Sequence, residues 1–291
     1  MGKFLSVKFK KKLSFRAIFY ALLILAFLWT VIIEPRWVAK REIVLNLTKT
    51  GQLNGLKVVL CSDWHFTKRP LWRVMTIERA RKIVNEINAS KPDIIILAGD
   101  FIADTDYQFE ISGSAEEEIA TILGELKAKH GVYATLGNHD WWFNGEAFTK
   151  ALQHHNITVL ENNSIKINGL NLWLAGIGDA LTNHANVYAA LKDIPENAPA
   201  IIAMHDPGSL QQVSASWQNS NALFLAGHTH GGQVYLPWYG APIVPATSPR
   251  EWAYGWVKYN NHSMYVTSGL GVSILPIRLN MRPEWVEFIL H

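Results

Sequence analysis

Six short runs of apolar and β-branched residues recur along the chain, and glycine, asparagine or aspartate marks the end of most of them. The runs are Leu56–Leu60, Ile94–Ala98, Val132–Leu136, Leu172–Ala175, Ala200–Met204 and Ala222–Ala226. Continuous apolar runs of this length, bounded by turn-forming residues, are typical of strands buried on both faces. Strands of this kind need helices to cover them, so the pattern predicts an α/β (α+β layered) fold.

Longer amphipathic segments separate the early runs. Residues Thr76–Asn88 place apolar side chains at helical spacing, and Ser114–Lys127 and Glu146–His155 also suit helices. From Gly232 onward the pattern is rich in strand-like pieces and poor in helical ones. These pieces are Gln233–Leu236, Trp252–Lys258, Met264–Thr267 and Glu284–Leu290. They predict a second sheet packed on the first.

Five polar motifs stand directly after the apolar runs or within three residues of them. They are Asp63-Trp64-His65, Gly99-Asp100, Gly137-Asn138-His139-Asp140, the single His205, and Gly227-His228-Thr229-His230-Gly231-Gly232. In open α/β sheets, functional groups gather outside the carboxyl ends of the strands. Motifs that are far apart in the sequence are therefore expected to meet in one crevice. The spacing of two residues within Asp-x-His and His-x-His lets each pair point its side chains toward one place.

The donor atoms of these motifs favour metal binding. Carboxylate, amide and imidazole groups without thiolate suit Mn²⁺, Fe or Zn²⁺ better than a structural zinc site, which usually contains cysteine. The candidate ligands are Asp63, His65, Asp100, Asn138, His205, His228 and His230. These are too many for one ion, but they suit two ions that share a bridging carboxylate, an arrangement used for displacement at phosphorus. Each motif alone has an ordinary explanation as a turn or a cap, whereas all five in order point to one site.

The ordered motif set resembles that of the calcineurin-like metallophosphoesterases, from about Leu56 to the C-terminus. The resemblance implies a four-layer β-sandwich flanked by helices, and metal-dependent hydrolysis of phosphoester bonds. It also implies two divalent ions, with Mn²⁺ expected first and Fe or Zn²⁺ as alternatives. One ion is implied to be held by Asp63, His65, Asp100 and His230, and the other by Asp100, Asn138, His205 and His228. His139 is implied to be the catalytic group that protonates the leaving oxygen or stabilises phosphoryl charge, with Asp140 orienting it.

Two details refine this resemblance. Many members of the family have the motif GDxxD, whereas this chain has Asp104 one residue later, so Asp104 is expected to be a loop residue. A further set of segments resembles a bacterial membrane-associated branch of uncharacterised phosphodiesterases and a UDP-2,3-diacylglucosamine pyrophosphatase of lipid A synthesis. These segments are 228–233, Pro237, 240–242, 268–271, 276–278 and 283–284. The branch makes that pyrophosphate the leading expected substrate. A phosphomonoesterase or nucleotidase, and a non-catalytic membrane scaffold, are the alternatives.

The N-terminal region predicts a membrane anchor. Residues Ala17–Ile33 contain no charge, and as a helix they span roughly 26 Å. A core helix seldom lacks a polar face, and residues 34–37 offer no small-residue cleavage site for a signal peptidase. We therefore expect a basic N-terminus and anchor over residues 1–41, with the helix at about 15–33. One catalytic domain is expected over residues 42–291, with a linker at 34–50.

The distribution of charge constrains the partners. Residues 1–41 hold nine of the 27 basic and one of the 24 acidic side chains, which leaves 18 basic and 23 acidic side chains in the body. An acidic body lacks the electrostatic footprint of a nucleic-acid-binding protein. The expected partners are instead the bilayer and a membrane lipid or lipid-linked nucleotide, with a single-pass or monotopic anchor in the bacterial inner membrane. The positive-inside rule favours a body outside the cytoplasm, whereas a UDP-linked lipid is met from the cytoplasm, so the two indications oppose each other.

Overall fold

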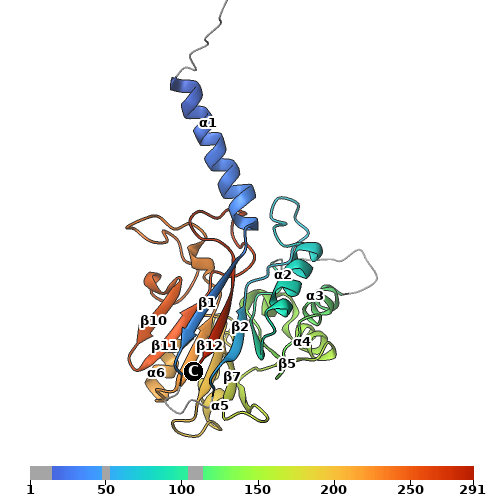
Figure 1. Ribbon diagram of the computed structural model, residues 1–291, viewed down its shortest axis with the longest axis vertical. Helices are drawn as coiled ribbons and strands as arrows, with labels where there is room; N and C mark the ends of the chain where they lie inside the picture. The colour runs from blue at the N-terminus through green and yellow to red at the C-terminus, as the bar shows by residue number, and fades with distance from the viewer. Residues whose placement is uncertain (1–14, 48–52, 104–113) are drawn as a thin grey trace, which may run out of the picture.

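Two six-stranded sheets form the body of the protein in the computed structural model, which describes residues 15–47, 53–103 and 114–291 (Figure 1). The first sheet has the order β1 (Ala39–Leu45), β12 (Glu284–Leu290), β2 (Leu56–Cys61), β3 (Ile94–Ala98), β4 (Val132–Thr135) and β5 (Ile157–Val159). The second has the order β10 (Gly255–Tyr259), β11 (His262–Val266), β9 (Ala222–Ala226), β8 (Ala200–Met204), β7 (Trp173–Ile177) and β6 (Asn163–Lys166).

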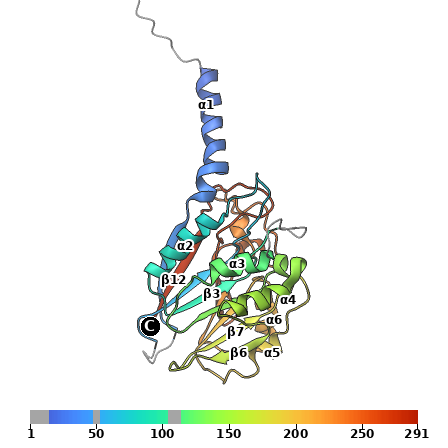
Figure 2. The same ribbon diagram turned by 90° about the vertical axis from the view of Figure 1, so that its right-hand side faces the viewer.

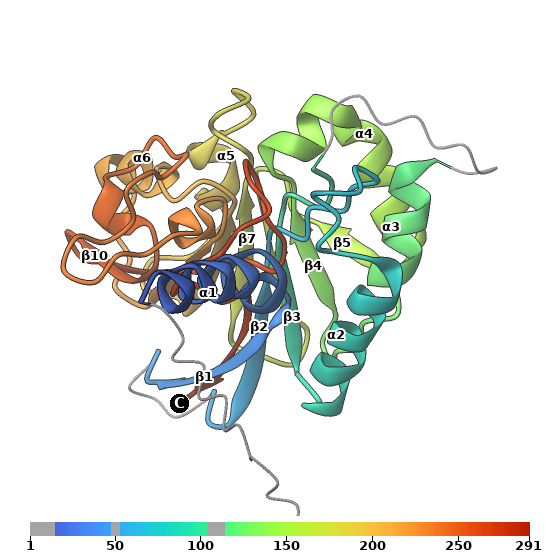
Figure 3. The same ribbon diagram turned by 90° about the horizontal axis from the view of Figure 1, so that it is seen from above.

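Helices cover the outer faces of both sheets. Seen from above, α2 (Ile77–Ala89), α3 (Ala115–Leu123) and α4 (Asn138–His154) lie beside the first sheet, and α5 (Val187–Leu191) and α6 (Ser209–Ser216) lie beside the second (Figure 3). Three apolar clusters separate the four layers, and the central one joins side chains of both sheets, such as Val58 and Phe288 with Ile201 and Leu225. The expected four-layer α/β sandwich is confirmed.

The helix α2 follows directly from its sequence. The hydroxyl of Thr76 accepts a hydrogen bond from the backbone N–H of Arg79 and so caps the first turn. Its buried residues are Ala80, Ile83, Val84 and Ile87, a spacing that forms one face of a helix. The side chains of this face pack into the cluster beneath β2 and β3. The helix predicted over residues 76–88 is thus confirmed, shifted by one residue.

Three predicted elements differ in the structure. Helix α4 begins at Asn138 rather than at Glu146, and a non-helical residue, Asn144, interrupts it, so the Asn-His-Asp motif forms its first turn. Residues 233–236 make only isolated bridges, from Val234 to Leu279 and from Leu236 to Gly240. The last predicted strand, β12, belongs to the first sheet rather than the second, because it lies between β1 and β2.

The expected linker at residues 34–50 is wrong, because β1 lies within it and pairs with β12. The boundary expected after residue 41 therefore cuts a strand of the body. The charges of β1 made it resemble a linker, yet they pair with buried carboxylates. Lys40 Nζ lies 2.7 Å from Glu287, and Arg41 Nε lies 2.9 Å from Glu284, and both glutamate side chains are only 1% exposed.

Strand directions fix which end of the body faces the N-terminal helix. Helix α1 (Phe15–Leu28) continues through a π-helical turn at Trp29–Ile33 and a 3-10 turn at Glu34–Arg36, and β1 starts three residues later. Strand β1 is parallel to β12, β12 is antiparallel to β2, and β3 and β4 are parallel to β2. The carboxyl ends of β2, β3 and β4 therefore lie at the end of the sheet from which α1 leaves (Figures 1 and 2).

Two truncations test the role of β1. A chain that begins at Glu34 keeps β1 and is expected to elute as a folded species. A chain that begins at Asn46 lacks β1 and leaves the buried carboxylates of Glu284 and Glu287 without their half-exposed cations, at a cost of about 1–3 kcal/mol for each unpaired group. Since a domain is stable by only about 5–15 kcal/mol, we expect the shorter chain to aggregate. Size-exclusion chromatography and thermal unfolding check this, and equal behaviour of the two chains would contradict it.

Candidate metal centre

The five polar motifs meet at one end of the two sheets. Asp63 and His65 follow β2, Asp100 follows β3, and Asn138 begins α4 just after β4. From the second sheet, His205 follows β8, and His228 and His230 follow β9. All of these side chains belong to residues that are at most 6% exposed. The predicted convergence is therefore observed.

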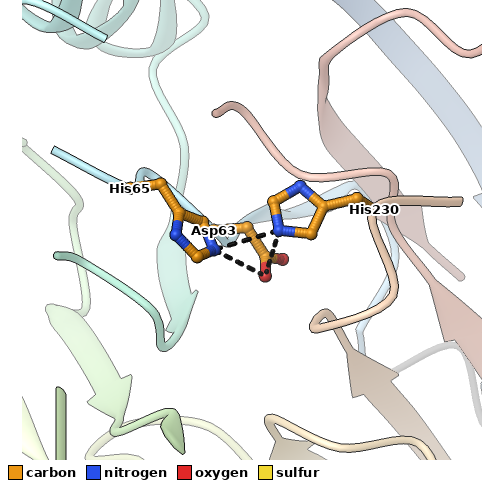
Figure 4. Close-up of side chains that lie close together, drawn as sticks. All are labelled: Asp63, His65 and His230. Carbon is orange, nitrogen blue, oxygen red and sulfur yellow. Dashed lines mark hydrogen bonds and ion pairs between the residues drawn. The ribbon is translucent and has the colours of Figure 1, made fainter. Parts of the chain in front are cut away.

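The first group consists of Asp63, His65 and His230, whose polar atoms turn toward one point (Figure 4). Asp63 Oδ1 lies 3.8 Å from His65 Nε2 and 3.4 Å from His230 Nε2, and the two Nε2 atoms are 3.0 Å apart. Two ligand atoms that bind one ion at about 2.0–2.2 Å lie roughly 3–3.5 Å from each other. The group therefore has the dimensions of one coordination site.

The second group consists of Asp100, His205 and His228. His205 Nε2 lies 3.2 Å from Asp100 Oδ2 and 3.1 Å from His228 Nδ1. The same Asp100 Oδ2 atom lies 3.3 Å from His65 Nε2 in the first group. This carboxylate thus stands between the two groups, where a bridging ligand belongs. His205 also donates its Nδ1–H to the carbonyl of Ala98 at 2.7 Å, a contact that metal-binding histidines usually make with the nitrogen that faces away from the ion.

An orphaned buried atom tests whether these residues fit metal ions. The Asn138 Oδ1 atom is buried and has no hydrogen-bond partner among the described residues. Leaving such an atom unpaired costs about 1–3 kcal/mol, unless another ligand engages it. It is an oxygen donor of the kind that divalent ions accept. The cluster fits divalent cations on these grounds.

The backbone is strained where it presents these side chains. Five candidate ligands have left-handed φ angles, namely Asp63 (55°), His65 (48°), Asp100 (55°), His228 (69°) and His230 (52°). Left-handed backbone is unfavourable for residues other than glycine, and such strain concentrates at functional sites. At Gly99 (φ 82°) an added Cβ would collide with the backbone nitrogen of Gly137, so the Asp100 turn also requires a glycine.

Opposite charges stabilise one another inside the cluster. Burial opposes ionisation of Asp63 and Asp100, yet neighbouring histidines hold the pKa of both carboxyls below the usual range. Burial also opposes protonation of His65, but its hydrogen bonds with Asp100 and Asp63 raise its pKa to about 9. For His230, burial and then the charges of His65 and Arg278 lower the pKa, so this ring is neutral. The carboxylates are therefore in the ionised form that metal ions require, and His65 would release a proton on metal binding.

Residues 56–232 match the calcineurin-like phosphoesterases. The chain belongs to this family. It is 30% identical to the uncharacterized metallophosphoesterase YkuE of Bacillus subtilis, over 89% of this chain and 87% of the relative. It is 32% identical to phosphodiesterase YaeI of Escherichia coli, over 67% of this chain and 68% of the relative. A "transmembrane protein with metallophosphoesterase domain" of Danio rerio is 30% identical over 82% of this chain, which spans about half (54%) of that relative.

The family and the side-chain clusters together support two divalent ions in this phosphoesterase. It is a metal-dependent hydrolase of phosphoester bonds, as the motif resemblance implied.

The expected contact between Asp140 and His139 is not what the structure contains. The Asp140 carboxylate instead accepts hydrogen bonds from the backbone N–H groups of Gly137 (2.9 Å), Asp100 (2.8 Å) and Phe101 (2.8 Å). The His139 ring is held by the carbonyl of Ala103, 2.8 Å from Nδ1. Asp140 therefore braces the turn that carries Asp100, because a buried carboxylate needs N–H donors and this turn supplies them. Burial and the charge of Asp100 raise the pKa of Asp140 to about 7.

A cleft of about 400 Å³ opens above the cluster, and His139 lies in its wall. Since a carbonyl can only accept, His139 donates its Nδ1–H to Ala103, and its Nε2 is the nitrogen left for other partners. Trp142 lines the same cleft at 5.1 Å from the His139 ring, whereas Trp141 stacks on His184. Of the two adjacent tryptophans, Trp142 therefore lines the cleft, whereas Trp141 packs against His184.

Arg278 is a supporting residue that the sequence indicated only as part of a Pro-Ile-Arg segment. Its side chain is fully buried and donates to the backbone carbonyls of Ser268 (2.7 Å), Gly271 (2.7 Å) and Met281 (3.0 Å). Its Nη2 also lies 3.4 Å from His230 Nδ1. The guanidinium thereby joins the loop behind Asp63 to the ring of a candidate ligand. A fully buried arginine cannot be read from one sequence, because arginine is usually exposed.

Asp100→Ala tests the shared carboxylate. Both groups lose a ligand atom, so we expect the variant to retain little metal and to lose nearly all activity. Asp93→Ala removes a carboxylate at the opposite end of β3, where it accepts a hydrogen bond from Lys57 N–H, and is the matched control. Metal analysis by mass spectrometry after gel filtration measures the outcome. A variant that keeps two ions per chain would show that Asp100 is not shared.

Arg278→Met tests whether the buried guanidinium holds the His230 ring in place for metal binding. The change leaves buried carbonyls without donors, each at a cost of about 1–3 kcal/mol, so the melting temperature should fall. It should also weaken metal binding by about 10–100-fold, the usual effect of removing a group that orients a ligand. Arg282→Met, which removes an arginine stacked on the exposed Trp37, is the control. Metal affinity equal to that of the wild type would limit Arg278 to a structural role.

Proposed function

We propose that this phosphoesterase hydrolyses a phosphodiester or pyrophosphate bond of a substrate held at a membrane surface. The observation that carries the proposal is the position of the metal cluster, at the end of the sheet from which the apolar helix α1 leaves. The relative YaeI, named a phosphodiesterase, supports the bond type. The relative named a transmembrane protein supports attachment to a bilayer.

The cluster supplies the ligands for two ions under this proposal. Asp100 is shared, and each ion has three further ligands. One ion is held by Asp63, His65, Asp100 and His230, and the other by Asp100, Asn138, His205 and His228. Mn²⁺ is the first ion to test and Fe or Zn²⁺ the next, because oxygen and imidazole donors suit all three. When bound, such a pair supplies Lewis-acid activation of water and neutralises phosphoryl charge.

His139 is the proposed catalytic residue. Its Nδ1–H is committed to Ala103, so its Nε2 is the atom available to a leaving oxygen or a phosphoryl oxygen. Burial and the charge of His65 lower its pKa, whereas the charge of Asp100 opposes this effect. Its backbone N–H donates to Asp100 Oδ1 at 2.9 Å, which fixes its place beside the shared carboxylate. Asp140 acts as a positioning residue through the Asp100 turn.

The apolar helix is proposed to be a membrane anchor. Residues Phe15–Arg36 form a helix that is long and apolar enough to cross a membrane, and almost none of it is buried against the body. Its end is fastened to the body, since the buried Glu34 accepts hydrogen bonds from Met281 N–H (2.8 Å) and Trp29 Nε1–H (2.7 Å). We propose attachment to the bacterial inner membrane.

UDP-2,3-diacylglucosamine is the leading substrate under this proposal, because it joins a pyrophosphate to acyl chains. Hydrolysis of a soluble phosphomonoester or nucleotide is the second candidate, and the open 400 Å³ cleft above the cluster would accommodate one. Purified full-length protein with Mn²⁺ is to be screened against the UDP-lipid, p-nitrophenyl diesters and p-nitrophenyl phosphate. Turnover of the monoester alone would overturn the diester and pyrophosphate proposal.

His139→Gln tests the proposed catalyst. We expect both ions to remain bound and kcat to fall by roughly a hundred- to ten-thousand-fold, the usual size of a lost general acid. The loss should be smallest for p-nitrophenyl diesters, whose leaving group needs little protonation, and largest for an alcohol leaving group. A uniform loss would instead indicate charge stabilisation. His154→Gln, which changes an exposed ring on α4, is the control, and loss of metal from His139→Gln would refute both roles.

A further inference from the structure

An apolar pocket of about 240 Å³ lies beside the metal cleft. Its apolar walls are Val234, Pro242, Ile243, Ile274, Leu275 and Ile277. The pocket shares Pro245, Ser273 and Ile274 with the wall of the metal cleft, so the two spaces are neighbours. His230, a candidate metal ligand, lies at the boundary of the pocket. A molecule that fills both spaces would have a polar end at the metals and an apolar end here.

The polar side chain of Gln233 lines this pocket, and both ends of its amide are hydrogen-bonded to the protein backbone. Its Nε2 donates to the carbonyl of Leu275 at 2.9 Å, and its Oε1 accepts from the backbone N–H of Ser273 at 2.6 Å. These bonds hold the loop that forms one wall. Because this amide is satisfied internally, it does not call for a polar occupant. The walls therefore favour an aliphatic group, which gains free energy by leaving water.

The surroundings indicate where such an aliphatic group comes from. Exposed apolar side chains lie on the segments that form the pocket, including Trp238 (103% exposed), Ile243 (69%) and Ile274 (63%). These segments lie at the end of the body from which α1 leaves (Figures 1 and 3). The pocket wall is also tied to the base of that helix, since the N–H of Arg278, next to Ile277, donates to the carbonyl of Thr30 at 2.9 Å. An anchor in a bilayer would thus bring the pocket to the bilayer surface.

We propose that this pocket binds the first methylenes of a lipid chain whose phosphorus lies in the metal cleft. The inference rests on the proposed function and adds to it, because it makes the substrate an amphiphile that the enzyme recognises by its chain as well as its phosphate. The occupant is a lipid of the membrane that holds α1. The pocket volume limits recognition to part of one chain, so the remainder of the chain stays in the bilayer.

Binding of alkyl phosphates tests the pocket without requiring turnover. The full-length protein in phosphatidylcholine nanodiscs with Mn²⁺ is titrated with ethyl, butyl, hexyl and octyl phosphate by calorimetry, and empty nanodiscs are subtracted. We expect Kd to fall by roughly fourfold for each added methylene, until the pocket is filled. The double variant Ile243→Ser/Leu275→Ser should reduce the ethyl-to-octyl gain by about tenfold or more. Both side chains are at least half exposed, so thermal unfolding should be unchanged.

Tyr188→Ser is the matched control, because it removes an exposed apolar side chain (77% exposed) from α5, far from α1 (Figure 1). It should keep the wild-type dependence on chain length. The same dependence in the double variant, or no dependence in the wild type, overturns the inference. Hydrolysis of p-nitrophenyl diesters by the same samples is measured separately. Chain-dependent binding without any hydrolysis would overturn the proposed function alone, and hydrolysis without chain-dependent binding would overturn this inference alone.

Discussion

The buried carboxylate of Asp100 is the constraint around which the end of the molecule is arranged. A carboxylate out of water needs cations or N–H donors on its lone pairs, and this one has the imidazoles of His65 and His205 and the backbone N–H of His139. These partners come from three strand ends and both sheets, so the sheets must meet here. Residues of the cluster also form hydrogen bonds between the two sheets, since His205 donates to the carbonyl of Ala98 and the backbone N–H of His228 donates to Asp63. The polar site therefore also joins the two layers.

The residues that carry the candidate ligand atoms also have unfavourable backbone conformations. The side chains reach the cluster only because the backbone turns left-handed at most of the candidate ligands, and the buried Asn138 Oδ1 atom is left unpaired. Both features lower the stability of the protein, and both concern groups that bound cations would engage. Hydrogen bonds in the surrounding structure offset this loss of stability. Asp140 satisfies three backbone N–H groups of the two turns that meet at Asp100, and Arg278 satisfies carbonyls of the loops behind His230. These two supports hold the turns in place before any ion binds.

Much of the fold and the site was predictable because the informative residues are local. Runs such as Ile94–Ala98 and Ala200–Met204 are buried on both faces, so their sequences are apolar throughout and their ends are marked by the motifs. Strand β1 was missed because it pairs with a single neighbour, β12, and its charges pair with buried glutamates almost 250 positions away, at 284 and 287. The contact of Asp140 was missed for a similar reason. A carboxylate next to a histidine suggests a pair, whereas here the backbone of a distant turn competes for the same oxygens.

The place of β12 decides which way the site faces. The chain enters β1 from α1 and runs away from the helix, and β12 lies beside it in the same direction. Strand β2 is antiparallel to β12 and therefore runs back toward α1. Strands β3 and β4 are parallel to β2 and run in the same direction. Had β12 been absent and β2 paired in parallel with β1, the motifs of β2, β3 and β4 would have ended at the far side of the body. One strand, contributed by the last residues of the sequence, therefore orients the metal cluster toward the helix formed by the first described residues. No flexible linker separates α1 from β1, and the hydrogen bonds of Glu34 and Thr30 to residues 281 and 278 hold the helix in a fixed orientation relative to the cleft.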